Sequence, residues 1–179
     1  QHALVFSLIL LLIGLLLGVL TGSMYAIIIV FIVSITLFFY AIWLKKTPLI
    51  GNIVVGILTG VTFVAGGVTV RSIKETIVPA TFAFLFTTAR EIIKDIEDIE
   101  GDVAQGAGTI AVRWGEHVAV VIASAFMLTL IFFSFIPYLL GIYSWLYLIV
   151  VVVGVDLVLV FLLVQLWRDV SKESCARIQ

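Results

Sequence analysis

Apolar residues occur along this chain in long blocks that polar residues interrupt only at intervals. Six apolar stretches stand out, at about residues 3–20, 24–44, 49–70, 77–93, 116–136 and 142–167. Each approaches or exceeds the ~20 residues with which an α-helix crosses the hydrocarbon core of a membrane. The stretches lack the strict alternation of a barrel strand, so helices, which satisfy their own backbone hydrogen bonds, are the predicted elements.

Short polar or helix-breaking segments separate several of these stretches. Thr21-Gly22-Ser23 follows the first, Lys45-Lys46-Thr47-Pro48 follows the second, and Pro137 with Gly141 follows the fifth. The first stretch lacks the basic segment and cleavage site of a signal peptide, and another stretch follows it directly. No linker divides the chain, so residues 1–179 are expected to form a single transmembrane domain.

Composition agrees with a membrane protein. Hydrophobic residues make up 63% of the chain and charged residues 12%, whereas a soluble domain carries roughly 25% charged residues. The net charge of -1 gives no basic face for a nucleic acid. The fold class predicted from these properties is all-α, a multi-span transmembrane helix bundle.

The basic residues predict the orientation of the bundle. With alternating connections, only Arg71 and Lys74 fall on one side of the membrane. The other side carries the larger set, Lys45, Lys46, Arg90, Lys94, Arg113, Arg168, Lys172 and Arg177. The positive-inside rule makes this second side cytoplasmic.

Glycines recur at four-residue steps in two of the stretches. Gly14, Gly18 and Gly22 lie in or after the first, and Gly56 and Gly60 lie in the third. Small residues at this spacing allow two membrane helices to approach closely. Helix packing is therefore their predicted role.

An acid-rich segment continues directly from the fourth apolar stretch, over residues 90–102. At about 100° per residue, Asp95, Asp98 and Asp102 fall within a ~60° arc of a helix, and Glu91 joins them. Glu97 and Glu100 point to the opposite face, and Lys94 flanks the stripe. Gly101 is a candidate end of the regular helix, which would displace Asp102 from this projection.

Carboxylates on one helix face repel one another unless a cation lies between them. Mg²⁺ prefers oxygen ligands and commonly bridges one or two carboxylates to a phosphate group. No histidine lies in the segment, which argues against zinc. The alternative is a solvated charged helix end beside the membrane, since charge runs are often only solubilising. After Asp102, residues 103–109 are small and flexible, and predict a loop or short helix that covers the acidic face as a lid.

Further polar residues cluster on the same side of the membrane. Tyr40, Lys45 and Lys46 end the second stretch, and Asn52 begins the third. The two lysines are either a positive-inside anchor or the countercharge for an anionic leaving group.

Asp156 lies in the middle of the sixth stretch. An ionised carboxylate there costs roughly 2.5–3.5 kcal/mol on insertion scales, so the side chain should face the bundle interior. It is a candidate for a cavity-lining residue, with an interhelical hydrogen bond as the equal alternative.

The segment Arg90–Asp102 resembles the second aspartate-rich motif of the UbiA superfamily of intramembrane prenyltransferases. The following Gly106-x-x-Thr109-x-x-Val112-x-x-Gly115 is similar to the sequence that trails that motif. Residues 40–52 resemble the loop after the fourth helix of the family. With Gly56, Gly60 and Gly66-Gly67, the chain looks most like the archaeal digeranylgeranylglyceryl phosphate synthases.

The resemblance implies a fold of nine helices around a lipid-open cavity, with two aspartate-rich motifs that hold Mg²⁺ and a prenyl diphosphate. The first motif, Asn-Asp-x-x-Asp, is absent from this chain, and about six of the nine helices can be counted. We therefore expect a domain truncated at both ends, which lacks the first two helices and the last and is inactive alone.

The resemblance also implies roles for individual residues. Asp95, Asp98 and Asp102 would bind Mg²⁺ and, with Lys94, act in catalysis. Residues that would bind the diphosphate are Lys45, Lys46, Arg90, Tyr40 and Asn52. The implied reaction joins a geranylgeranyl group from its diphosphate to geranylgeranylglyceryl phosphate, a lipid-like acceptor, and so forms the second ether of archaeal lipids.

Three alternatives remain open. The acceptor of a UbiA-type enzyme can also be an aromatic quinone precursor. A CDP-alcohol phosphatidyltransferase would use similar elements, but its Asp-Gly-x-x-Ala-Arg signature is missing. From another functional class, a cation channel or transporter could use Asp156 and the acidic face to line a path.

Overall fold

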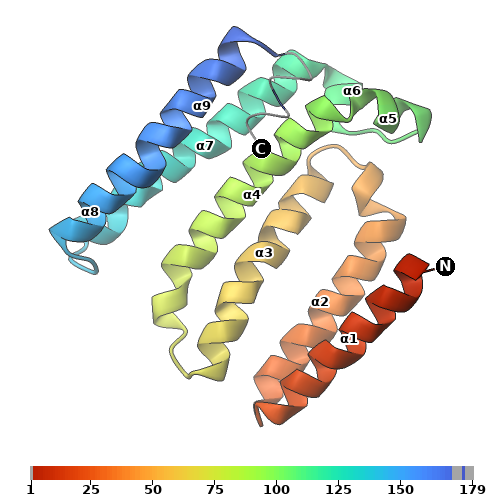
Figure 1. Ribbon diagram of the computed structural model, residues 1–179, viewed down its shortest axis with the longest axis vertical. Coiled ribbons are helices and arrows are strands. Elements are labelled where there is room, and N and C mark those ends of the chain that lie inside the picture. The colour runs from red at the N-terminus through yellow and green to blue at the C-terminus, as the bar shows by residue number, and fades with distance from the viewer. Residues whose placement is uncertain (1, 171–174, 176–179) are drawn as a thin grey trace.

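The computed structural model describes residues 2–170 and Cys175, and these residues form helices and their connections, with no strand among them. Figure 1 shows the helices side by side in an open bundle. In chain order they are α1 (His2–Leu20), α2 (Met24–Ile42), η1 (Leu44–Lys46), α3 (Ile50–Thr69), η2 (Lys74–Thr76), α4 (Ile77–Glu97), α5 (Ile99–Ala104), α6 (Ile110–Trp114), α7 (Glu116–Leu139), α8 (Trp145–Val151), η3 (Val152–Asp156) and α9 (Leu157–Arg168). The predicted all-α architecture is confirmed.

Five helical segments of the described chain are long and apolar enough to cross a membrane. They are Met24–Ile42, Ile50–Thr69, Lys74–Glu97, Glu116–Leu139 and Trp145–Arg168. The first predicted stretch also forms a helix, α1 (His2–Leu20), and its segment Leu8–Leu20 is apolar. The chain is thus a multi-pass membrane protein.

The centre of the bundle lies where α4 packs against α7. Ile92, Ile93 and Ile96 of α4 are almost completely buried, together with Ala119 and Val120 of α7. The short helices α5 and α6 lie at the end of the bundle where α4 and α9 finish (Figure 1). The same end carries the connection from α2 to α3, so the polar loops predicted to share one side of the membrane lie at one end of the bundle.

Glycines bring α3 directly against α4. An added Cβ at Gly56 would overlap the Thr88 hydroxyl and lie 2.8 Å from the carbonyl oxygen of Phe84. At Gly60 it would lie 2.9 Å from the carbonyl oxygen of Ala80. Backbone contact of this kind confirms the predicted packing role of the α3 glycines, because no larger residue fits there.

The glycines of the first stretch behave differently from one another. Gly18 faces α2, where an added Cβ would be 3.8 Å from Ile27 and Val30. Gly14 has no neighbour within 4 Å of such a Cβ, and Gly22 lies in the turn after α1 with φ at 65°. The packing prediction therefore holds for Gly18, whereas Gly22 permits the left-handed conformation of a turn.

Candidate active site

A polar pocket of about 230 Å³ opens at the end of the bundle that carries α5 and α6. Side chains from α2, η1, α3, α4, α5 and the connection to α6 form its wall. The lining residues are Tyr40, Lys45, Thr47, Gly51, Asn52, Glu91, Lys94, Asp95, Asp98, Gly101, Asp102, Gln105 and Thr109. All three predicted aspartates are therefore brought to one pocket, with Lys94 and Glu91 beside them.

The residues of the acidic stripe face one pocket although the helix that carries them is interrupted. The prediction that Gly101 ends the regular helix is wrong, because α4 ends at Glu97 and α5 begins at Ile99. Asp98 lies between them with φ −91° and ψ 9°, and Gly101 is inside α5. Asp102 still faces the pocket, so the one-sided stripe does not depend on one continuous helix.

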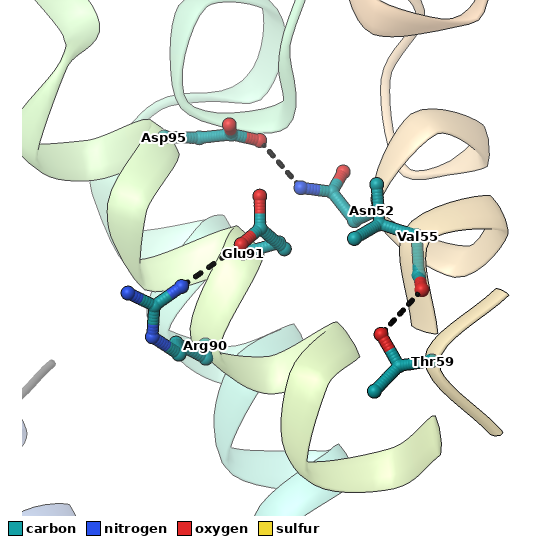
Figure 2. Close-up of polar contacts among 6 residues, drawn as sticks. All are labelled: Asn52, Val55, Thr59, Arg90, Glu91 and Asp95. Carbon is teal, nitrogen blue, oxygen red and sulfur yellow. Dashed lines mark hydrogen bonds and ion pairs between the residues drawn. The ribbon is translucent and has the colours of Figure 1, made fainter. Parts of the chain in front are cut away.

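Asp95 is anchored by a residue from the neighbouring helix. The side-chain amide of Asn52, in the first turn of α3, donates a hydrogen bond to Asp95 Oδ2 at 2.8 Å (Figure 2). Asn52 is buried, with 7% of its surface exposed. Its amide thus contacts a carboxylate of the stripe, and its role towards a diphosphate stays a prediction.

The predicted cationic residues divide into two groups. Lys45 and Lys94 line the pocket, whereas Lys46 and Arg90 do not. Arg90 instead forms an ion pair with Glu91, with 3.0 Å between Nη1 and Oε1 (Figure 2). Arg90 therefore contacts the pocket residue Glu91 and does not line the pocket itself, and its role towards a diphosphate stays a prediction.

The partner of Asp102 is Thr109, a contact that the sequence pattern did not predict. The Thr109 hydroxyl donates a hydrogen bond to Asp102 Oδ2 at 3.0 Å. Gln105 also lines the pocket, as the lid predicted for residues 103–109 requires. The sequence signal was the position of Thr109 in the motif that trails the acidic segment, but contact with Asp102 depends on the path of the loop between them.

The fit of a divalent cation can be judged from this donor set. Four carboxylates, from Glu91, Asp95, Asp98 and Asp102, line the pocket, and oxygen ligands suit Mg²⁺. Within the described part of the chain, however, no three acidic, histidine or cysteine residues are gathered closely enough to hold an ion. The residues therefore fit a cation held by one or two carboxylates and completed by phosphate and water, and do not form a closed cage.

Comparison with known proteins decides the family. The sequence profile of the UbiA prenyltransferase family matches residues 1–179. The chain belongs to the UbiA prenyltransferase family.

Named relatives and a solved structure narrow the similarity within this family. The chain is 44% identical over 122 residues to a digeranylgeranylglyceryl phosphate synthase of Methanothermobacter thermautotrophicus, covering 68% of this chain and 43% of the relative. It is 38% identical over 151 residues to the synthase of that name from Methanosphaera stadtmanae, covering 84% and 55%. A solved structure reported for digeranylgeranylglyceryl phosphate synthase in membranes superposes with a TM-score of 0.79 at 32% identity, covering 97% of this chain and 61% of that one. The chain thus spans about half the length of the curated relatives it matches.

Asp156 of this UbiA family member lies apart from the pocket. It ends the π-helical turn η3 and is 4% exposed. Its Oδ2 accepts a hydrogen bond from the Ser134 hydroxyl of α7 at 2.9 Å, and Tyr147 donates to the Ser134 carbonyl oxygen at 3.0 Å. Asp156 lines neither the polar pocket nor the apolar groove between α2 and α3. The interhelical hydrogen bond is therefore present, and the cavity-lining role stays a prediction.

The basic residues divide between the two ends of the bundle. Lys45, Lys94, Arg113 and Arg168 belong to segments at the end that carries the pocket, while Lys74 belongs to the turn at the other end (Figure 1). Two further basic residues of the orientation argument, Lys172 and Arg177, lie outside the described residues.

Proposed function

We propose that the chain provides the diphosphate-binding pocket of an intramembrane prenyltransferase. The proposed reaction transfers a geranylgeranyl group from its diphosphate to geranylgeranylglyceryl phosphate and forms the second ether of archaeal membrane lipids. Family membership and the names of the curated relatives support this proposal. The observation that carries it is the one-sided set of pocket carboxylates, with Lys45 and Lys94 lining the same pocket.

The pocket matches the charge of a diphosphate and its counterion. One or two of the three aspartates Asp95, Asp98 and Asp102 would hold Mg²⁺, which when bound would supply positive charge to the departing diphosphate. Lys45 and Lys94 would each donate charge-assisted hydrogen bonds to phosphate oxygens, which are about twice as strong as neutral ones. These cations balance the negative charge that appears on the leaving group.

Charge development then drives the transfer. As the C1–O bond of the prenyl diphosphate breaks, its electron pair leaves with the diphosphate and C1 gains carbocation character. The hydroxyl oxygen of the acceptor forms the new C–O bond and loses its proton, which the departing diphosphate would take up. Gln105 and Thr109 lie in the segment after the acidic helix. They help to cover the pocket and exclude water, which would otherwise react with the carbocation at C1.

The location of the pocket is part of the proposal. Most of the described basic residues lie at the pocket end of the bundle, and the positive-inside rule places such an end in the cytoplasm. A cytoplasmic pocket would give access to soluble Mg²⁺, while the apolar helices keep the prenyl chains in the membrane.

The test uses the full-length gene product in liposomes, because the matched stretch makes up 43–55% of the relatives quoted above. Labelled geranylgeranyl diphosphate and geranylgeranylglyceryl phosphate are supplied with and without Mg²⁺. We compare the wild type with Asp98→Asn and with Glu100→Gln, an exposed residue outside the pocket. Mg²⁺-dependent diether that is lost only in Asp98→Asn is the expected result.

Two other outcomes of this assay would change the proposed acceptor or the proposed functional class. Pyrophosphate release with an aromatic acceptor alone would keep the family chemistry and replace the acceptor. No consumption of diphosphate, together with cation flux across the liposome membrane, would overturn the enzyme and favour a channel or transporter.

A further inference from the structure

Thr109 occupies a helix-capping position but does not use its side chain as a cap. It is the N-cap residue of α6, with extended backbone at φ −62° and ψ 169° and no side-chain cap hydrogen bond. A threonine at such a position usually accepts a hydrogen bond from a free N–H of the first turn. Here the hydroxyl instead donates to Asp102 Oδ2 at 3.0 Å, and Thr109 is only 4% exposed. The local helix thus forgoes a capping bond and the carboxylate gains one.

The backbone around Thr109 contacts two segments that carry charged residues of the pocket, α5 and η1. The N–H of Ala107 donates to the Asp102 carbonyl oxygen at 2.9 Å, and the N–H of Gly108 donates to the Lys46 carbonyl oxygen at 2.9 Å. A Cβ at Gly108 would lie 3.3 Å from that oxygen. Residues 107–109, which we name the strap, therefore join the acidic helix to the lysine-bearing turn η1.

Asp102 lies beyond the break in the acidic helix, so α4 does not fix its position. It lies on α5, a helix of six residues that is separated from α4 by the break at Asp98. A continuous helix would fix its distance from Asp95, but the break removes this constraint. Within the described residues, Thr109 supplies the side-chain hydrogen bond recorded for the Asp102 carboxylate.

We propose that Thr109 is a positioning residue that orients the Asp102 carboxylate towards the cation and diphosphate of the pocket; this inference rests on the proposed function. A hydroxyl is suited to the task because it is neutral. It holds Oδ2 and leaves both Oδ1 and the full negative charge available to a ligand, whereas a lysine at this position would neutralise the charge and compete with the cation. Loss of such a supporting partner typically reduces metal affinity or activity by about 10- to 100-fold.

The test measures cation binding directly. Mn²⁺ is titrated into the full-length protein with inorganic pyrophosphate, and bound Mn²⁺ is followed by electron paramagnetic resonance. Thr109→Val keeps the shape of the side chain and removes the hydroxyl, while Thr109→Ser keeps the hydroxyl. Thr81→Val is the matched control, because the Thr81 hydroxyl bonds to the Ile77 carbonyl oxygen of its own helix. Thermal unfolding of each variant is recorded in the same detergent.

We expect Thr109→Val to weaken Mn²⁺ binding by about 10- to 100-fold, with near-wild-type binding in Thr109→Ser and Thr81→Val and similar melting temperatures. The double variant with Thr109→Val and Asp102→Asn should bind Mn²⁺ as weakly as the single variant Asp102→Asn. Equal binding by Thr109→Val and the wild type would overturn the positioning role, as would equal losses in Val and Ser or an unfolded Thr109→Val. A wild-type protein that binds no Mn²⁺ with pyrophosphate would overturn the proposed function as well, which separates the two failures.

Discussion

The Asn52 amide donates to the Asp95 carboxylate at 2.8 Å and so joins two residues that are 43 positions apart in the chain. The bond links the start of α3 to the last turn of α4, at the pocket end of the two closely packed helices. Like the Thr109 hydroxyl on Asp102, the amide is a neutral donor. It therefore orients a carboxylate without cancelling the charge that a cation would recognise.

Replacing Asn52 by leucine should impair the pocket without unfolding the bundle. Asn52→Leu keeps the branching of the side chain but leaves Asp95 Oδ2 without its donor, so the carboxylate is free to turn. We expect Mg²⁺-dependent turnover to fall by about 10- to 100-fold, the usual consequence of losing a partner of a metal ligand. The measurement is the Mg²⁺ concentration that gives half-maximal turnover in liposomes.

Gln165→Leu is the matched control for Asn52→Leu, because it removes an amide from α9, which does not line the pocket. Turnover in this control should match the wild type. Wild-type Mg²⁺ dependence in Asn52→Leu would contradict the orienting role of the amide.

The helices were predictable from the length of the apolar stretches, and the acidic stripe from its helical spacing. Apolar stretches long enough to span a membrane become helices whatever their neighbours are, and a spacing of three or four residues brought Asp95 and Asp98 to one face. The contacts of Asn52 and Thr109 were not predictable in this way, because each depends on how another segment packs. The break at Asp98 was also missed. Glycine is the stronger local signal for a helix end, which favoured Gly101. The helix α4 instead ends at Glu97, where the chain turns into α5.

Lys45 and Lys46 also differ in a way that depends on packing and not on the local sequence, and this difference gives a second prediction. Adjacent lysines are equivalent in the sequence, but only Lys45 lines the pocket. A hydrogen bond to a charged group contributes about 1.5–3 kcal/mol, so Lys45→Met should weaken binding of geranylgeranyl diphosphate about 10-fold or more. Lys46→Met should change it by less than about 3-fold. Competition binding with labelled diphosphate measures both, and equal losses would show that the lysines act only through the general surface charge.

The contact between α3 and α4 gives a third prediction. Gly56→Ala places a methyl group against the Thr88 hydroxyl and 2.8 Å from a backbone oxygen of Phe84, so the helices must separate. Overpacking of this kind typically lowers the free energy of unfolding by about 1–3 kcal/mol. Gly66→Ala is the control, because its Cβ would meet nothing within 4 Å and alanine favours a helix by up to about 1 kcal/mol. Equilibrium unfolding in mixed detergent micelles compares the two, and a stable Gly56→Ala variant would refute the close packing.

Asp156 and Ser134 give the last prediction, which separates stability from function. Ser134 donates to Asp156 Oδ2 at 2.9 Å, while Oδ1 is buried without a hydrogen-bond partner among the described residues. In a double-mutant cycle of Ser134→Ala and Asp156→Leu, the coupling energy should be about 0.6 kcal/mol and at most about 1.7 kcal/mol, the range found for hydrogen bonds between membrane helices. Thr129→Val controls for loss of a hydroxyl on α7, because Thr129 bonds within its own helix. Asp156 lines neither pocket. The Asp156→Leu variant should therefore bind geranylgeranyl diphosphate with the affinity of the wild type. A variant that folds normally but no longer binds the diphosphate would instead place Asp156 on the path of the substrate.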